Sequence, residues 1–299
     1  MTTHQDTGKH RTNTNDQFYT SDAVAKQCVQ WIITAVSASD GGGVAPPYDD
    51  GDYLWIEPSA GTGAFLRQLP PEFTKIGLDI DPKCDDIIKQ DYLTWQAPTV
   101  AKKGIIVFGN PPFGRQSSLA KAFIAKSCSF ANIIAFILPK SFTKPSMYNA
   151  FHPRFHMIFN EELDKNAFII NGGTAYDVPC VFQIWEKKAT ERPKDEKVAP
   201  IGFEYVASAT SSFALRRVGG LAGKCYTDTA TRSTQSHYFI RFNDTVSPVP
   251  AAYHANIIAK INKHTFPSNT VGPRSLSKSE VNVVLNQIIA EATATMKLS

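Results

Sequence analysis

The sequence has no hydrophobic run long enough to cross a membrane, although 42% of its 299 residues are apolar. A spanning helix needs about 20 consecutive apolar residues, whereas this apolar fraction is spread along the chain and can form a buried core. The polar start, Met1 to Asn15, has no apolar segment resembling a signal peptide, and we expect a flexible tail there. The sequence therefore predicts no membrane contact, and its length predicts one catalytic domain with a smaller second unit.

Cysteine is scarce and widely spaced, with five residues and no C-x-x-C pair. This pattern predicts neither a disulfide framework nor a structural zinc site, and it favours a reducing compartment such as the cytoplasm. His152 and His156 have the i, i+4 spacing of metal ligands, but Pro153 lies between them and no acidic residue accompanies them. We therefore interpret them as surface or packing residues, and we predict no metal site. The cysteines are Cys28, Cys84, Cys128, Cys180 and Cys225.

The G-x-G-x-x-G fingerprint of dinucleotide-binding proteins is also missing, because Gly61 and Gly63 have no third glycine at the required spacing. These two glycines follow a strand-like run, Tyr53 to Ile56, and allow the backbone to turn tightly and approach a ligand. We expect a helix to begin in the segment 64–69. The preceding Glu57 would repel a pyrophosphate but suits an ammonium or sulfonium group, so the sequence disfavours NAD.

Two acidic residues follow at the ends of further strand-like segments. Asp79 ends the run that begins at Lys75, about twenty residues after the glycines, where open α/β sheets hold a ribose. Asp91 follows the apolar pair Ile87-Ile88. Either acid alone is also typical of a helix cap or a solvated loop. Their joint order after the glycine loop favours a ligand site.

The tetrapeptide Asn110-Pro111-Pro112-Phe113 directly follows the apolar run 105–109. Asparagine and proline are ordinary turn residues, so the segment alone could simply end a strand. An amide, two prolines and an aromatic ring at a strand end would also hold a flat heterocycle that carries an exocyclic amine. The upstream glycine loop favours this second interpretation.

Together these motifs resemble the S-adenosylmethionine-dependent N6-adenine DNA methyltransferases, over roughly residues 15 to 187. The resemblance implies that the EPxxGxG-type loop binds the methionine part of the cofactor and that the acids after the second and third strands bind its ribose and adenine. The segment 16–21 is similar to the N-terminal cofactor motif of this family. The implied cofactor-binding residues are Phe18, Tyr19, Thr20, Glu57, Ser59, Gly61, Gly63, Asp79, Ile80, Asp91, Tyr92 and Asn110.

The same resemblance implies that Asn110, Pro111, Pro112 and Phe113 are the catalytic residues and hold the target base. The Asn110 side-chain oxygen and the Pro111 carbonyl would accept the two N–H bonds of the amine and stabilise positive charge as it attacks the methyl group. Pro112 would keep the loop stiff, and Phe113 would stack on the base. Phe168 lies where the family often has a second stacking aromatic, but a core strand phenylalanine is an equally good interpretation.

The family fold is an α/β Rossmann-like seven-stranded methyltransferase sheet with helices on both faces, and we expect a small basic C-terminal α+β region beside it. The cofactor loop precedes the catalytic loop, which resembles the gamma-type motif order. The predicted organisation is a tail (1–15), a methyltransferase domain (16–187), a linker (188–200) and a target-recognition region (201–299). Within the domain we expect a helix over 117–129, a strand over 133–138 and a hairpin-like pair formed by 167–170 and 178–185.

The net charge of +4 comes entirely from the C-terminal third. Residues 200–299 hold ten Lys/Arg and five Asp/Glu, which gives +5, whereas the remainder holds 21 and 22, which gives −1. Charge alone favours a solubilising surface, but together with the catalytic resemblance this division suggests contact with a polyanion. Arg216, Arg217 and Lys224 are the candidate substrate-binding residues. Near the end of the chain, Ser277 and Glu280 form a capping box that predicts a final packing helix.

The sequence therefore predicts methyl transfer from S-adenosylmethionine to the N6 amine of adenine, with DNA favoured over RNA. Messenger and ribosomal RNA enzymes also use an NPPF motif, and protein-glutamine N5-methyltransferases present a similar NPPY. A catalytically silent cofactor-binding subunit is disfavoured because both motif sets are intact. The target sequence, a restriction partner and the oligomeric state stay open.

Overall fold

The computed structural model describes residues 19–39, 53–99, 103–170, 174–176, 178–193, 197–243, 248–267 and 274–294. The chain forms two compact units, Met1–Lys194 and Asp195–Ser299. The division between them falls within the charged, proline-containing segment 188–200. The predicted tail, 1–15, lies outside the described residues.

Unit 1 is built around a seven-stranded sheet with the order β4-β3-β2-β5-β6-β10-β7. β4, β3, β2, β5 and β6 run parallel, and β10 runs antiparallel to both β6 and β7. This confirms the predicted seven-stranded sheet with its antiparallel end. The strands are β2 (Tyr53–Glu57), β3 (Lys75–Asp79), β4 (Ile88–Lys89), β5 (Gly104–Gly109), β6 (Ile133–Pro139), β7 (Phe155–Glu162) and β10 (Cys180–Lys187).

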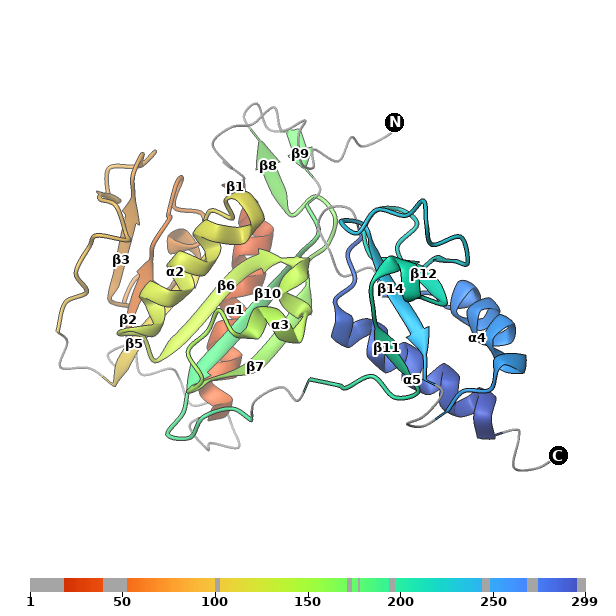
Figure 1. Cartoon of the computed structure of the whole chain (residues 1–299). Helices are drawn as coiled ribbons and strands as arrows, with labels where there is room; N and C mark the ends of the chain where they lie inside the picture. The colour runs from red at the N-terminus through yellow and green to blue at the C-terminus, as the bar shows by residue number, and fades with distance from the viewer. Residues whose placement is uncertain are drawn as a thin grey trace. The chain divides into compact units, whose positions relative to one another are not determined.

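Helices cover both faces of this sheet, as predicted (Figure 1). α1 (Asp22–Ser39) contributes Ile32 to a core cluster that includes Trp55 and Phe108. α2 (Ser118–Cys128) belongs to a second cluster, on the other face of the sheet, that includes Leu54 and Ile134. Every residue of β2, β5 and β6 is buried. Burial on both faces explains why these parallel strands are continuous apolar runs rather than alternating patterns.

We expected a helix to begin within 64–69, but only a single 3-10 turn, η2 (Leu66–Gln68), forms there. The two glycines before it have positive φ angles, and Leu69 is extended because proline at position 70 disfavours helical geometry in the residue before it. Close packing also limits this region, because a Cβ on Gly77 would lie 2.4 Å from the Leu66 side chain.

The hairpin expected between 167–170 and 178–185 is also wrong. β8 (Phe168–Ile170) instead pairs with β9 (Thr174–Tyr176) and with the N-terminal β1 (Tyr19–Thr20) in a separate three-stranded sheet. The apolar strand β10 lies between β6 and β7 in the main sheet, where its first six residues are buried. The short segment 174–176 therefore provides the return strand of the hairpin.

The remaining elements of unit 1 follow two central strands. η3 (Arg115–Ser117) follows β5 and leads into α2, which matches the helix predicted over 117–129. η4 (Lys140–Thr143) and α3 (Pro145–Tyr148) follow β6. Buried Gln183 of β10 supports this second connection, because its amide donates to the Phe142 carbonyl at 3.1 Å.

Unit 2 is an α+β region, as predicted. Its antiparallel sheet has the order β11-β14-β12-β13, and α4 and α5 contribute to the same core as one sheet face. Ser277 and Glu280 form the predicted capping box: the Ser277 backbone N–H donates to Glu280 Oε2 at 2.8 Å, and the Glu280 N–H donates to Ser277 Oγ at 3.2 Å. The elements are β11 (Phe203–Tyr205), η5 (Ser208–Thr210), β12 (Phe213–Arg216), β13 (Cys225–Tyr226), β14 (His237–Phe242), α4 (Ala251–Lys263) and α5 (Lys278–Ala294).

Three properties of the described residues bear on function. No helix within the described part of the chain is long and apolar enough to span a membrane. The five cysteines are free thiols, and His156 lies on β7 with its ring nitrogen 2.9 Å from the Thr190 carbonyl oxygen. Among the described residues, no group of three or more His, Cys, Asp or Glu side chains could hold a metal ion.

Candidate active site

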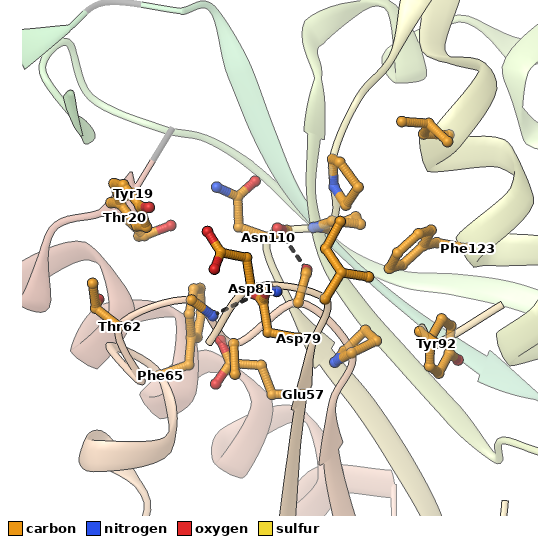
Figure 2. A pocket seen from close by; sticks show the side chains of 18 of the residues that line it. Tyr19, Thr20, Glu57, Thr62, Phe65, Asp79, Asp81, Tyr92, Asn110 and Phe123 are labelled. Atoms are coloured by element: carbon orange, nitrogen blue, oxygen red, sulfur yellow. Dashed lines mark hydrogen bonds between the residues drawn. The ribbon is translucent and has the colours of Figure 1, made fainter. Parts of the chain in front are cut away.

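A pocket of about 340 Å³ opens at the carboxyl ends of β2, β3 and β5, the edge where open α/β sheets bind ligands. Figure 2 shows Tyr19 and Thr20 on one side and Tyr92 and Phe123 on the other, with Asn110 and Asp79 between them. The lining residues are Tyr19, Thr20, Glu57, Pro58, Ser59, Ala60, Gly61, Thr62, Ala64, Phe65, Asp79, Ile80, Asp81, Asp91, Tyr92, Leu93, Asn110, Pro111, Pro112, Phe113, Leu119 and Phe123.

The glycine loop is held against the end of β3. The Gly61 backbone N–H donates to Asp79 Oδ2 at 2.7 Å, and the Ala60 N–H donates to the Leu78 carbonyl at 2.9 Å. Gly61 has a φ of +52°, and a Cβ there would lie 3.2 Å from the Tyr19 ring. Both the backbone conformation and the close approach of Tyr19 therefore require glycine at this position.

Asp79 is a fixed carboxylate in the wall of the pocket. Its Oδ2 accepts from Gly61, and its Oδ1 accepts from the Asp81 backbone N–H at 2.8 Å. Its backbone carbonyl also accepts from the Gln90 N–H at 2.8 Å. These bonds leave each carboxylate oxygen with further acceptor capacity, so Asp79 can accept hydrogen bonds from ligand hydroxyl groups.

Glu57 contacts the chain after the glycine loop and the end of β5, and it is only 2% exposed. Its Oε2 accepts from the Leu66 N–H at 3.2 Å, and its Cγ lies 3.1 Å from where a Cβ would stand on Gly109. Burial raises the pKa of this carboxyl well above its usual range, and the Leu66 hydrogen bond opposes that rise. Gly109, with a φ of +122°, allows β5 to end against this side chain.

The segment Asn110 to Phe113 is tied to the glycine loop through the backbone. Ser59 Oγ donates to the Asn110 carbonyl oxygen at 3.0 Å. Pro111 and Phe113 are buried, whereas the Asn110 side chain is half-buried at the pocket. After this segment Gly114, Gln116 and Ser117 all have positive φ values, between 53° and 67°, and the chain turns into α2.

The opposite wall is mainly apolar and aromatic. The Tyr92 and Phe123 rings have centroids 5.0 Å apart, and the Tyr92 hydroxyl is 2.7 Å from Ser127 Oγ. Burial raises the pKa of Tyr92, which keeps this hydroxyl protonated. Asp91 Oδ1 accepts from the Leu93 N–H at 2.9 Å, which orients the turn at the edge of this wall.

Thr20 presents a buried hydroxyl to the pocket. The residue is 8% exposed, and its Oγ1 has no hydrogen-bond partner within the protein. Burying a hydroxyl without a partner is unfavourable by about 1–3 kcal/mol. A ligand with a polar group at this position would relieve that cost.

The structure brings most of the sequence-predicted site residues into this one pocket, with four groups of exceptions. Gly63, with a φ of +76°, shapes the loop but does not line the pocket. Phe168 is fully buried in the core on β8, which favours its packing interpretation. Phe18 lies outside the described residues. The candidate substrate residues Arg216, Arg217 and Lys224 all belong to unit 2.

Sequence reasoning missed part of the apolar wall. Leu93, Leu119 and Phe123 line the pocket, although no short motif contains them. Leu119 and Phe123 are spaced i, i+4 on α2, the helix that follows the segment Asn110 to Phe113, and this periodicity was the available signal. Thr62 and Phe65 lie within the glycine loop but were not assigned a role.

No known family model matches the chain, and no curated protein matches it. Among solved structures, it is similar to a protein from Pyrococcus horikoshii assigned provisionally as an RNA methyltransferase, with 14% identity, 61% of this chain and 93% of the other covered, and a TM-score of 0.43. It is also similar to magnesium protoporphyrin IX methyltransferase from Synechocystis, solved with S-adenosylmethionine. The identity is 11%, the match covers 56% of this chain and 81% of the other, and the TM-score is 0.37. These likenesses are too low to bear on substrate, and the fold assignment rests on the strand order of the chain itself.

Proposed function

We propose that the protein transfers a methyl group from S-adenosylmethionine to the exocyclic N6 amine of adenine in DNA. One observation carries this proposal: the glycine loop, the acids after β3 and β4, and the segment Asn110 to Phe113 line the same pocket. The Ser59 hydrogen bond to the Asn110 carbonyl fixes the two loops to each other. A cofactor site and an amine site would thus be held at a constant separation.

The pocket chemistry fits S-adenosylmethionine, which would supply an electrophilic methyl group on a sulfonium centre. Asp79 would accept from the ribose hydroxyls, and the orphaned Thr20 hydroxyl would bind a polar group of the cofactor. Tyr92, Leu93 and Phe123 would cover the adenine ring. Besides Glu57, whose carboxyl has a raised pKa, the lining residues include three aspartates and no lysine or arginine, which disfavours a pyrophosphate ligand and suits a sulfonium cation.

Asn110 and Pro111 would act on the target amine. The lone pair of an adenine amine is delocalised into the ring, which makes the nitrogen a weak nucleophile. The Asn110 side-chain oxygen and the Pro111 carbonyl would accept its two N–H bonds and favour a more tetrahedral nitrogen. Acceptors that are already in place when positive charge develops stabilise the transition state without reorganisation.

The preference for a nucleic acid rests on unit 2. Within it, residues 200–299 hold ten basic and five acidic residues, a charge of +5, which suits a polyanion better than a protein glutamine substrate. The same reaction on RNA is the nearest rival, since an NPPF segment and a basic surface serve either polymer. N5-glutamine methylation is the more distant rival.

The test is incubation of the full chain with methyl-labelled S-adenosylmethionine and duplex DNA, single-stranded DNA, RNA or protein. Labelled nucleosides and amino acids are then separated by chromatography and mass spectrometry. We expect N6-methyl-deoxyadenosine. Label only in RNA would replace DNA as the substrate, and label only in glutamine would overturn the nucleic-acid proposal.

A further inference from the structure

The sheet of unit 2 has one face covered by helices and one that carries basic and aromatic side chains. Leu215 and Ile240 belong to the core that includes α4 and α5. Arg216 pairs directly with His237, and Ala214 pairs with Tyr226. Because side chains alternate across a strand, Arg216, Tyr226 and His237 all lie on the face opposite this core.

The loop between β13 and β14 adds to this face. Arg232 places its guanidinium group over the Tyr226 ring, 4.0 Å from the ring centre, and its Nε donates to the Asp228 carbonyl at 3.2 Å. The Tyr226 and His237 rings lie edge to face, with centroids 5.8 Å apart. Cations and aromatic rings thus gather around His237.

His237 is the unusual member of this cluster. It is only 5% exposed, and its Nε2 has no hydrogen-bond partner within the protein. Its Nδ1 lies 3.2 Å from the Ser233 carbonyl oxygen and 3.0 Å from Ser236 Oγ. Because a carbonyl oxygen can only accept, we assign the ring proton to Nδ1, which leaves a lone pair on Nε2.

The charge state of His237 agrees with this tautomer. Burial lowers its pKa, the Ser233 hydrogen bond opposes the shift, and the charges of Arg216 and Arg232 lower it further. The ring is therefore neutral at pH 7. A neutral, buried acceptor between two guanidinium groups lacks a donor, which a ligand can provide.

We propose that Arg216, Tyr226, Arg232 and His237 form a nucleotide-reading site on unit 2, separate from the methyl-transfer pocket. His237 Nε2 accepts from the exocyclic amine of a flanking adenine or cytosine, and the two arginines bind the adjoining phosphates. The inference rests on the proposed function for its choice of a nucleic acid. Thymine and uracil present an acceptor, O4, at the corresponding position and leave the histidine lone pair unsatisfied.

The site can be tested by binding alone, with no methyl donor present. Single-stranded homopolymers of deoxyadenosine, deoxycytidine and thymidine are titrated into the full chain and followed by fluorescence anisotropy. We expect the adenine and cytosine polymers to bind about tenfold more tightly than the thymine polymer, since only they satisfy the buried acceptor. Equal affinity for all three polymers would overturn the proposal.

Two substitutions of His237 sharpen the test. His237→Phe keeps an aromatic ring but removes the acceptor, so the preference should disappear while affinity for the thymine polymer stays within about twofold. His237→Gln can rotate its amide to donate or accept, and it should bind the thymine polymer more tightly than the original protein does. If the Phe variant fails to fold by circular dichroism, the Gln variant decides. The control, His264→Phe, replaces an exposed histidine after α4 and should retain the preference.

The arginines are tested through salt dependence. Arg216→Gln and Arg232→Gln should each weaken binding of all three polymers and reduce the slope of log affinity against log salt by roughly one. Lys263→Gln, which removes one positive charge at the exposed end of α4, is the matched control. If it has the same effect, the binding surface is not this sheet face.

The outcomes also separate this inference from the proposed function. If methyl transfer to DNA occurs but the His237 variants keep the original base preference, the reading site is wrong and the enzymatic proposal stands. If the preference depends on His237 but no polymer accepts a methyl group, the enzymatic proposal fails and the binding site stands.

Discussion

The Gly61 backbone N–H donates a 2.7 Å hydrogen bond to Asp79 Oδ2, which joins the glycine loop after β2 to the acid that ends β3. The carboxylate therefore has two roles. It fixes the loop conformation from within the protein, and it presents acceptor oxygens to the pocket. A substitution at Asp79 should affect loop order and ligand binding together.

Asp79→Asn should weaken S-adenosylmethionine binding by roughly thirtyfold, or about 2 kcal/mol, because an amide has one acceptor oxygen where the carboxylate has two. Isothermal titration calorimetry measures the change. Asp228→Asn, on unit 2, is the control. An unchanged dissociation constant for Asp79→Asn would show that this carboxylate does not bind the cofactor.

Asn110→Ala should reduce methyl transfer by at least about two orders of magnitude while cofactor affinity changes little. The Ser59 hydrogen bond uses the backbone carbonyl of Asn110, which alanine retains, so the loop should keep its position. Single-turnover transfer and calorimetric titration measure the two quantities separately. Loss of cofactor affinity in this variant would favour the cofactor-binding role that the resemblance also implies for Asn110, and it would contradict a side chain that acts only on the target amine.

Gly61→Ala should destabilise the protein by about 1 kcal/mol or more, because alanine is strained at a φ of +52° and its Cβ approaches the Tyr19 ring to 3.2 Å. Cofactor affinity should fall with it, since Tyr19 must move. Thermal unfolding with and without S-adenosylmethionine measures both effects. Gly220→Ala is the matched control, because a Cβ there meets nothing within 4 Å.

Glu57 should make stability depend on pH. Its folded-state pKa is raised, so its contribution is fully present below the unfolded value near 4.5 and is lost as the pH rises through the folded value. Glu57→Gln keeps an acceptor for the Leu66 N–H but cannot ionise. The melting temperature of this variant should therefore fall less with rising pH than that of the original protein. Parallel curves would show that Glu57 does not titrate in this way.

The central motifs were predictable from sequence because each depends on local chemistry. Glycines that need positive φ, acids at strand ends and continuous apolar runs are short-range signals, and the sheet and the pocket bring them together at one edge. The wall formed by Leu119 and Phe123 was not predicted, since a leucine and a phenylalanine at helical spacing usually pack in a core. The unpartnered nitrogen of His237 had no sequence signal, because it depends on Ser233 and on strand register.

The two mistaken elements have physical causes. The helix expected after the glycine loop is limited to one 3-10 turn by the prolines at positions 70 and 71. The expected hairpin was wrong because it paired β8 with the segment that forms β10 rather than with β9. Alternation and turn residues correctly indicated strands near 168 and 180, but strand pairing depends on the whole sheet. Only three residues separate the end of β8 from the start of β9, and β8 pairs with β9 rather than with β10.

The pairing of β1 with β8 places Thr20 opposite Phe168, nearly the whole length of unit 1 apart in sequence. During synthesis, the wall that carries Tyr19 and Thr20 therefore has no strand partner until the β8 segment has left the ribosome. A nascent chain that ends before this segment can form the glycine loop but lacks that wall. Cofactor affinity measured on stalled chains of increasing length should rise only after β8 emerges, so the ligand would report when this wall can form.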